Sequence, residues 1–223
     1  AYLTRALKNE RSLTAAGDRI HAILTEVSLP VPHFYHLDSR DVETIAFTPD
    51  SKTLITGSND NHVRLWDIDS NKEIANWKHG DRVQAIALSH DGQKIASGSR
   101  DGQVLIYDLS ANRLVGKPLE HQDDVNALVF SKDDRFLLVS SDDDSVHLWD
   151  WARGADRRRF FHESAVNEAR FSPDQGSVLS VSDDNTARLW DIASGREMLR
   201  VSHNDDVTNV EFHPNGSFFL SLN

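Results

Sequence analysis

Apolar and polar residues alternate over short stretches of this chain, and residues 162 to 191 display the pattern well. Three strands are predicted there, at Val166 to Phe171, Val178 to Ser182 and Ala187 to Trp190. The pair Pro173-Asp174 turns the chain after the first strand, and Asp183-Asp184-Asn185 turns it after the second. Short strands joined by tight turns predict an antiparallel meander.

The same pattern repeats along most of the chain. The first apolar residue of the unit recurs at steps of 41, 42, 41 and 41 residues, at Val42, Val83, Val125, Val166 and Val207. The aromatic residue before the last aspartate of the unit keeps the same step, at Trp66, Tyr107, Trp149 and Trp190. A period of about 40–45 residues with four strands per unit indicates a β-propeller, in which each unit, or blade, packs on its neighbours.

The first 30 residues follow a different pattern. Their apolar residues fall at helical spacings, at Leu3, Leu7, Ile20, Ile23, Leu24 and Val27. Pro30 and Pro32 then end the helical pattern, because proline lacks the backbone donor. We therefore predict a short α-helical lead-in or linker at residues 1–30, packed on the next domain, and a propeller at residues 31–223.

The repeated sequence motifs resemble WD40 repeats over about residues 36 to 223. They run from Ser58-Asn59-Asp60 to Leu65-Trp66-Asp67, from Ser99-Arg100-Asp101 to Ile106-Tyr107-Asp108, from Ser141-Asp142-Asp143 to Leu148-Trp149-Asp150, and from Ser182-Asp183-Asp184 to Leu189-Trp190-Asp191. The resemblance implies an all-β propeller of seven or eight blades, of which four complete blades and part of a fifth are present. Further blades or domains of the same polypeptide are therefore expected, with His33 to Leu37 as the outer strand of the last blade.

The resemblance also implies a buried polar ring of His, Ser or Thr, Asp and Trp in each blade. The implied rings are His79, Ser97 or Ser99, Asp101 and Tyr107; then His121, Ser141, Asp143 and Trp149; then His162, Ser180 or Ser182, Asp184 and Trp190. The sequence departs from this ring pattern at three positions. His36 lies six residues before its valine, whereas the later histidines lie four residues before theirs. Tyr107 replaces the ring Trp in one unit, and Val139 replaces a residue with a hydroxyl in another. The helical lead-in followed by WD40 units further resembles the carboxy-terminal part of STAND-type signalling ATPases, over about residues 1 to 60.

The motifs predict no catalytic residue, no metal site and no cofactor. Ser, His and Asp recur together in several units beside a Trp, as scaffold residues do, whereas a catalytic triad occurs once per site. The run from Asp142 to Asp144 is not an EF-hand, since the sixth and twelfth positions hold His147 and Arg153. The chain also has no Gly-x-Ser-x-Gly, no His-Glu-x-x-His and no P-loop sequence.

Composition narrows the choice of partner. The net charge of −11 argues against general binding to nucleic acid or to an anionic membrane. No cysteine is present, and no apolar run approaches the ~18 residues that span a membrane. We predict a cytoplasmic protein with a protein or peptide partner of basic character.

Charge is unevenly divided between the two ends of the predicted blades. In a meander, the turn after the second strand and the loop before the first lie at one end, which would carry Asp81, Asp123, Asp124, Asp142, Asp183, Asp205 and Asp206 with Arg82 and Arg100. The opposite end would carry Lys52, Lys72, Lys132, Arg153, Arg157, Arg158, Arg159 and Arg196. One hypothesis is that this end forms an acidic rim that binds a basic segment. The candidate contact residues are Asn59, Arg100, Asp142, Asp183, Asp123, Asp124, Asp205 and Asp206. The competing interpretation is that these residues are polar only because they lie in turns.

These observations predict non-catalytic recognition of a protein or peptide, as a ligand-sensing or scaffolding module of a larger protein. Two alternatives stay open. One is a passive assembly scaffold without a sensing role, and the other is a hydrolase that uses the central channel of the propeller.

Overall fold

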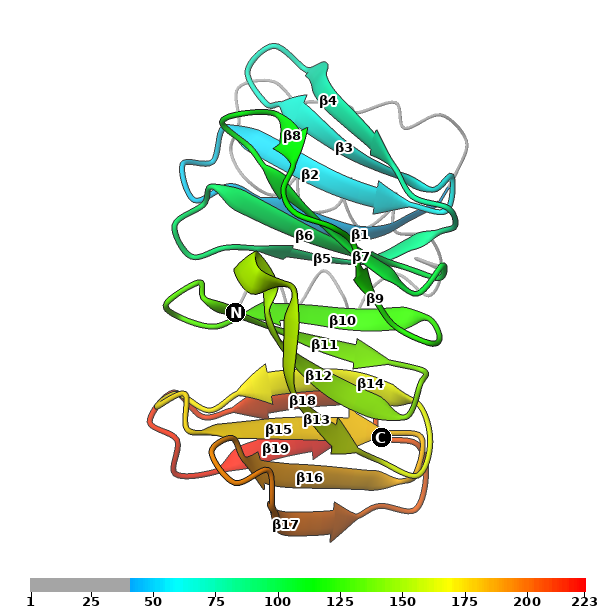
Figure 1. Ribbon diagram of the computed structural model, residues 1–223, viewed down its shortest axis with the longest axis vertical. Helices are drawn as coiled ribbons and strands as arrows, with labels where there is room; N and C mark the ends of the chain where they lie inside the picture. Colours follow the sequence, from blue (N-terminus) through cyan, green and yellow to red (C-terminus); the bar gives the residue numbers. More distant parts are fainter. Residues whose placement is uncertain (1–40) are drawn as a thin grey trace, which may run out of the picture.

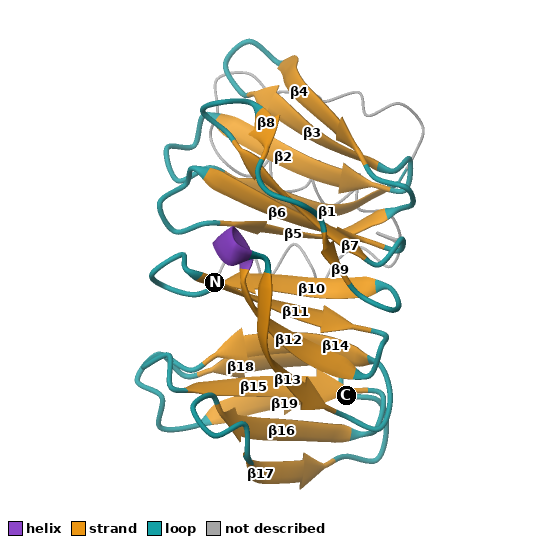
Figure 2. Ribbon diagram, in the orientation of Figure 1, coloured by secondary structure: helices purple, strands orange, loops and turns teal. Residues whose placement is uncertain are grey.

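Residues 41–223 are described by the computed structural model (Figure 1). The predicted helical lead-in at residues 1–30 and the predicted outer strand at His33 to Leu37 lie outside the described residues. Within the described part, strands joined by tight turns make up almost the whole chain, and the one helix is a short 3₁₀ turn (Figure 2).

Each repeat folds into its own antiparallel sheet, and the strands follow one another in chain order. Blade 1 comprises β1 (Val42–Phe47), β2 (Thr53–Ser58), β3 (His62–Asp67) and β4 (Lys72–Lys78). Blade 2 comprises β5 (Val83–Leu88), β6 (Lys94–Ser99), β7 (Gln103–Asp108), β8 (Arg113–Leu114) and β9 (Leu119–Glu120). Blade 3 comprises β10 (Val125–Phe130), β11 (Phe136–Ser141), β12 (Ser145–Asp150), the 3₁₀ helix η1 (Trp151–Arg153) and β13 (Ala155–Phe161).

Blade 4 comprises β14 (Val166–Phe171), β15 (Ser177–Ser182), β16 (Thr186–Asp191) and β17 (Glu197–Ser202). A two-stranded sheet of β18 (Asn209–Phe212) and β19 (Phe219–Leu222) forms the fifth unit. The all-β prediction and the four-stranded antiparallel units are therefore confirmed, and the three strands predicted in blade 4 agree with β14, β15 and β16 to within one residue at each end.

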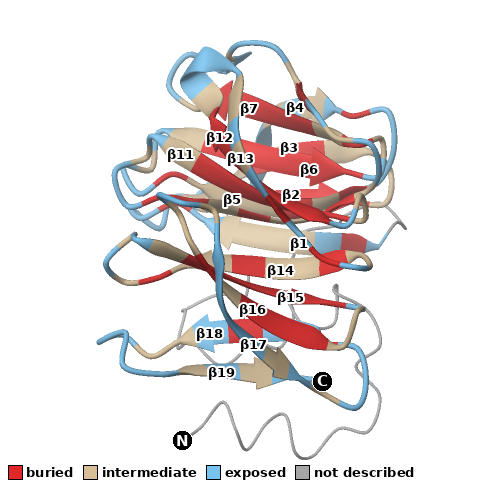
Figure 3. Cartoon of the chain, turned by 60° about the horizontal axis from the view of Figure 1, so that its bottom comes forward, coloured by how far each residue is buried: buried red, intermediate tan, exposed pale blue. Residues whose placement is uncertain are grey.

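The first strands of successive blades lie next to one another, β1 beside β5, β5 beside β10, β10 beside β14 and β14 beside β18. The blades therefore follow one another in chain order, as Figure 1 shows from β1 to β19. In the second strands, β2, β6, β11 and β15, five of six residues are buried, on both faces of the sheet (Figure 3). A strand buried on both faces loses its alternation of apolar and polar residues, which is the pattern of a sheet covered on both sides.

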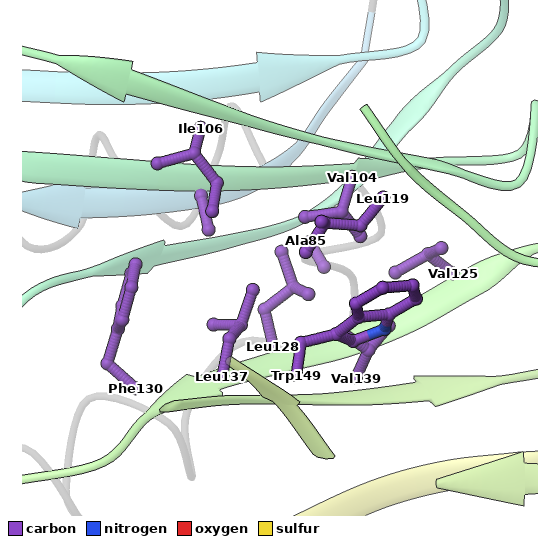
Figure 4. Close-up of a cluster of buried hydrophobic side chains, with 11 residues drawn as sticks. Ala85, Val104, Ile106, Leu119, Val125, Leu128, Phe130, Leu137, Val139 and Trp149 are labelled. Atoms are coloured by element: carbon purple, nitrogen blue, oxygen red, sulfur yellow. The ribbon is translucent and has the colours of Figure 1, made fainter. Parts of the chain in front are cut away.

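Apolar clusters fill the spaces between consecutive blades. Figure 4 shows the cluster between blades 2 and 3, where Ile106 and Leu119 of one blade face Leu128 and Trp149 of the next. Gly98 lies at this contact, and a Cβ there would come within 2.3 Å of a methyl group of Val125. Each sheet thus buries its apolar face only against a neighbour, as expected of a repeat protein.

The outer strand of blade 2 departs from the repeat. It is split into β8 and β9, with Gly116 at φ +73° and Pro118 between them. Proline cannot donate to a sheet ladder and glycine supplies the left-handed conformation, so regular pairing stops here.

Candidate functional site

The complete polar ring lies in blade 4. His162 Nδ1 is 2.9 Å from Asp184 Oδ2, and His162 Nε2 is 2.7 Å from Ser180 Oγ. The indole N–H of Trp190 donates to the same hydroxyl at 2.8 Å. These partners assign the proton of the neutral imidazole to Nδ1, which donates to the carboxylate, while Nε2 accepts from the serine. Of the two candidate serines, Ser180 enters the ring, whereas Ser182 donates to the carbonyl oxygen of Ser164 at 3.0 Å.

Asp184 in this ring also holds an arginine that the sequence analysis did not single out. Arg188 is 4% exposed, and its guanidinium lies 2.6 Å from Asp184 Oδ2 and 2.9 Å from Thr186 Oγ1. Burial opposes the charge of Asp184, but hydrogen bonds from Thr186, from the backbone N–H of Glu163 and from His162 outweigh it, so its pKa falls to about 2. Burial also lowers the pKa of His162, despite the nearby carboxylate.

The ring in blade 2 is looser. His79 Nε2 lies 2.7 Å from Ser97 Oγ, but His79 Nδ1 is 3.8 Å from Asp101, whose carboxylate accepts from Gly80 N–H at 2.6 Å. The Tyr107 hydroxyl is buried without a hydrogen-bond partner among the described residues, and burial raises its pKa to about 12. Burial likewise lowers the pKa of His79.

The ring of Tyr107 stacks on Trp77 of blade 1, with centroids 4.1 Å apart. The stack places an indole beside the site where other blades have their own tryptophan. Ser99, the alternative ring serine, instead donates to the carbonyl oxygen of Asp81 at 2.9 Å.

Blade 3 differs most from the implied ring. Val139 occupies the position of Ser97 and Ser180, so no hydroxyl separates the indole from the imidazole, and Trp149 Nε1 donates directly to His121 Nε2 at 3.0 Å. Ser141, placed in the ring by analogy, instead donates to the carbonyl oxygen of Asp123 at 3.3 Å. His121 is therefore neutral, with Nδ1–H facing the carbonyl oxygen of Gly102 at 3.3 Å. Burial, together with the charge of His147, lowers the pKa of His121 to about 4.

Asp143, the ring carboxylate of blade 3, pairs with a histidine that the sequence analysis did not assign to a ring. His147 Nε2 lies 2.9 Å from Asp143 Oδ2, and its Nδ1 lies 3.0 Å from Asp156 Oδ2. Burial alone would lower the pKa of His147, but the hydrogen bonds to these two carboxylates raise it overall. His147 occupies the same place as Arg188, four residues after the turn aspartate, so a basic side chain faces that aspartate in both blades.

Blades 1 and 5 contain parts of the same arrangement. In blade 1, Trp66 Nε1 donates to Thr56 Oγ1 at 3.1 Å, and Arg64 pairs with Asp60, again four residues apart. The ring histidine suggested for blade 1, His36, lies outside the described residues. In the fifth unit, His203 Nε2 lies 2.9 Å from Ser221 Oγ, the same 18-residue separation as in blades 2 and 4.

The turn after the second strand and the loop before the first strand lie at one end of each blade. Backbone N–H groups of the turns donate to carbonyl oxygens of those loops, Asn59 to Asp41, Arg100 to Arg82, Asp142 to Asp124 and Asp183 to Ala165. The candidate contact residues thus share one end, which we call the acidic end. Asn59, Arg100 and Asp142 begin equivalent turns in blades 1, 2 and 3.

Asp142 and Asp183 also serve the contact between blades. Asp142 accepts from the side chain of Asn126 at 2.6 Å, and Asn126 in turn donates to the carbonyl oxygen of Val166, the first residue of blade 4. Asn167 repeats this arrangement with Asp183 and Val207. Both asparagines lie at a bulge, where the register of the first two strands shifts.

Exposed carboxylates crowd the acidic end between blades 2 and 3. Asp81 and Asp123 are exposed and Asp124 is half-buried, with Arg100 3.5 Å from Asp124. The pKa of Asp124 is raised by burial and, against the attraction of Arg100, by the charges of Asp142, Asp123 and Asp81. Asp183, Asp205 and Asp206 extend the exposed negative charge toward the fifth unit.

Comparison with family profiles decides the family. The profile described as the nucleolar protein 10-like, N-terminal domain matches residues 34–188, which is more than half of the chain. The chain belongs to this family. A second profile, the WD domain, G-beta repeat, matches residues 196–221, so the WD40 resemblance is confirmed. No curated protein matches the chain.

WD40 propellers generally mediate protein–protein interaction or scaffolding, and they are typically non-catalytic. The described residues of this nucleolar protein 10-like domain contain two groups with the connectivity of a hydrolase triad. One is Ser180–His162–Asp184 of the blade 4 ring, and the other is Ser145–His147–Asp156, with Ser145 Oγ 2.9 Å from His147 Nε2. Ser180 is fully buried and accepts a hydrogen bond from Trp190, and Ser145 is only 1% exposed and donates to Asp143 at 2.6 Å. A buried hydroxyl that no substrate can reach cannot act as a nucleophile, so both groups are structural.

Two other features of the described residues bear on the predicted function. No group of three or more His, Cys, Asp or Glu side chains among residues 41–223 is arranged to hold a metal ion. No helix in that same range combines the length and the apolar character needed to cross a bilayer.

Proposed function

We propose that this nucleolar protein 10-like domain is a protein-recognition module that binds a basic segment at its acidic end. The observation that carries the proposal is the crowding of Asp81, Asp123, Asp124 and Asp142, where, within residues 41–223, Arg100 is the one cation that pairs with a carboxylate of this group. The pKa of Asp124 is raised in part by the charges of the other three carboxylates, which together form a region of negative potential, and a cationic partner relieves the repulsion. The surrounding loops are held in place by backbone hydrogen bonds, so the surface is already formed before binding.

Removing two exposed charges from the acidic end should weaken binding of a basic probe. Asp81→Asn with Asp123→Asn is expected to lower the affinity for a fluorescein-labelled octalysine peptide by ~3–10-fold at low salt. Asparagine keeps the side-chain oxygen that accepts from the following backbone N–H in both loops. Fluorescence anisotropy at several salt concentrations measures the affinity and its salt dependence.

The matched control removes the same charge elsewhere. Asp69→Asn with Glu211→Gln alters two exposed residues that lie away from the acidic end. An equal loss of affinity in both double variants would mean that the probe responds to net charge alone, and the proposed surface would be wrong.

The family description names a nucleolar protein, which favours a nucleolar location over the cytoplasmic one predicted from composition. We expect the tagged full-length protein to concentrate in nucleoli when imaged in cells, and a diffuse cytoplasmic signal would contradict this. The narrower likeness to STAND-type ATPases, with its ligand-sensing role, stays a prediction. Most of the residues that suggested it lie outside residues 41–223.

A further inference from the structure

Blade 3 departs from the repeat at the end opposite the acidic end. The last residue of the third strand is an aspartate in every complete blade, and in three of them it fixes the following turn through a serine or a backbone N–H. Asp67 and Asp191 each accept from the serine three residues later, and Asp108 accepts from Ser110 and Ala111. In blade 3 the residue three positions after Asp150 is Arg153, and the turn is the 3₁₀ helix η1.

Three arginines converge on the buried carboxylate of Asp150, whose side chain is 1% exposed. Its Oδ2 atom lies 2.8 Å from Arg153 and 3.2 Å from Arg157, and Arg135 lies 3.7 Å away. Burial disfavours the ionised carboxylate, yet the hydrogen bonds from Arg153 and Arg157 hold the pKa of Asp150 below its usual range. We call Arg135, Arg153 and Arg157 the arginine cluster.

The three positive charges of the arginine cluster exceed the single negative charge of Asp150 by two. The three side chains also remain accessible to solvent. The side chains of Arg135, Arg153 and Arg157 are 54%, 63% and 48% exposed. Each guanidinium has five N–H donors, and within residues 41–223 none of the three hydrogen-bonds to any acceptor besides Asp150. Most of their donors therefore face solvent.

Nearby carboxylates do not neutralise the arginine cluster by direct contact. Asp133 accepts from Ser131 Oγ and Arg135 N–H within its own turn. Asp134 accepts from the backbone N–H groups of His90 and Asp91 in blade 2. Arg135 is further positioned by the ring of Phe136, whose centroid is 4.8 Å from its guanidinium carbon.

The arginines belong to blade 3 alone. In blade 1 the equivalent positions hold Lys52, Ser70 and Ile74, and in blade 4 they hold Gly176, Ser194 and Met198. The fold of a blade therefore does not need guanidinium groups at these places. Because the repeat does not require these three cationic side chains for folding, we look for a role in ligand binding.

We propose that the arginine cluster is a binding site for the phosphate group of a phosphorylated protein segment. Three guanidiniums that meet at one point, with two charges in excess, match a compact dianion with several acceptor oxygens. Asp150 holds the guanidiniums in place before the ligand arrives. The net charge of −11 disfavours an extended polyanion such as RNA, whereas a single phosphate on a peptide needs only this local positive charge. This site is independent of the acidic end and does not rest on the function proposed above.

The first experiment uses inorganic phosphate and the full chain. Titration followed by NMR should shift the arginine Nε–H resonances of the wild type, and Arg153→Gln with Arg157→Gln should abolish a specific response. The second experiment uses a neutral decapeptide with one central phosphoserine, measured by fluorescence anisotropy. The phosphopeptide should bind at least ~10-fold more tightly than its unphosphorylated twin, and the double variant should lose this difference.

A matched control separates the site from general electrostatics. Arg196→Gln with Arg200→Gln removes two exposed arginines from the turn and outer strand of blade 4, and it should change phosphopeptide affinity less than ~2-fold. Arg153→Lys with Arg157→Lys keeps the charge but loses the planar fork, and an intermediate loss of ~3-fold or more is expected. Thermal unfolding verifies that each variant is folded. If a double variant does not fold, the single variant Arg135→Gln replaces it in the same binding measurements.

Several outcomes would overturn the proposal. They are the absence of a phosphate response in the wild type, equal binding of the phosphorylated and unphosphorylated peptides, and equal losses in the blade 3 and blade 4 variants. Tighter binding of a single-stranded oligouridine than of the phosphopeptide, with the same dependence on Arg153 and Arg157, would assign the cluster to nucleic acid instead.

Discussion

Replacing Asp184 with alanine is expected to lower the free energy of unfolding by about 3–5 kcal/mol. The reason is Arg188, which is 4% exposed and would be left as an uncompensated buried charge. His162 and Thr186 would lose an acceptor in the same step. Chemical denaturation followed by circular dichroism measures the change.

The matched variant is Asp101→Ala, which removes the equivalent carboxylate of blade 2. There the residue four positions later is Leu105, and the imidazole of His79 lies 3.8 Å away, so no buried cation loses its partner. We expect a loss of about 1–2 kcal/mol, mainly from the backbone hydrogen bonds to Gly80 and Gln103. Similar losses in the two variants would show that the ion pair with Arg188 is not the main contribution of Asp184.

Acidification from pH 6.5 to pH 4 should destabilise the fold, and His121 alone should account for up to about 3 kcal/mol. The unfolded chain binds a proton at this histidine near pH 6.5, whereas in the folded state its pKa is about 4. Protonation over this interval therefore favours the unfolded state. Burial lowers the pKa of His79 and His162 as well, and their contributions have the same sign.

His147 has the opposite effect. The pKa of His147 is raised because Asp143 and Asp156 hold its proton against the effect of burial, so its contribution is complete below pH 6.5 and is lost as the pH rises through the folded-state value. Asp143 and Asp184, whose pKa values are lowered, add a further loss of stability as the pH falls below about 4.

A variant isolates the part due to His121. Glutamine at position 121 offers an oxygen to Trp149 N–H and an amide to the carbonyl oxygen of Gly102, but it binds no proton. The free energy of unfolding, measured by urea denaturation at several pH values, should rise less steeply between pH 4 and pH 6.5 in His121→Gln than in the wild type. An unchanged slope would rule out His121 as a titrating group in this range.

The sequence predicted the strands and blades well because the repeat imposes the same apolar positions in every unit. The arrangement in blade 4 could be foreseen for the same reason, since His162, Ser180, Asp184 and Trp190 all have the expected residue types at the expected spacing. In blade 3 the loss of one hydroxyl at Val139 let Trp149 reach the histidine directly, and analogy could not anticipate that rearrangement.

The groups that sequence reasoning missed share one signal. Arg64, His147 and Arg188 lie four residues after a turn aspartate, on a strand whose apolar residues are buried, while blade 2 has Leu105 at that place. A basic residue at this position of the third strand, where an apolar residue would otherwise be buried, therefore indicates a pair with the turn aspartate. The arginine cluster could be recognised in the sequence only by the replacement of a turn serine by Arg153. Arg135 and Arg157 lie farther away along the chain and reach Asp150 only after folding, so the sequence alone does not group the three.

The placement of the indole rings gives the molecule separate optical reporters. Trp66 and Trp77 belong to blade 1, Trp149 and Trp151 to blade 3, and Trp190 to blade 4, while blade 2 has only Tyr107, stacked on Trp77. Trp149 lies parallel to the His147 imidazole at 6.2 Å, whereas Trp190 faces Ser180 and the neutral His162. Emission from Trp149 is therefore coupled to the protonation of His147 and of His121, to which its indole N–H donates. Single-tryptophan versions of the chain would follow the opening of individual blades by fluorescence.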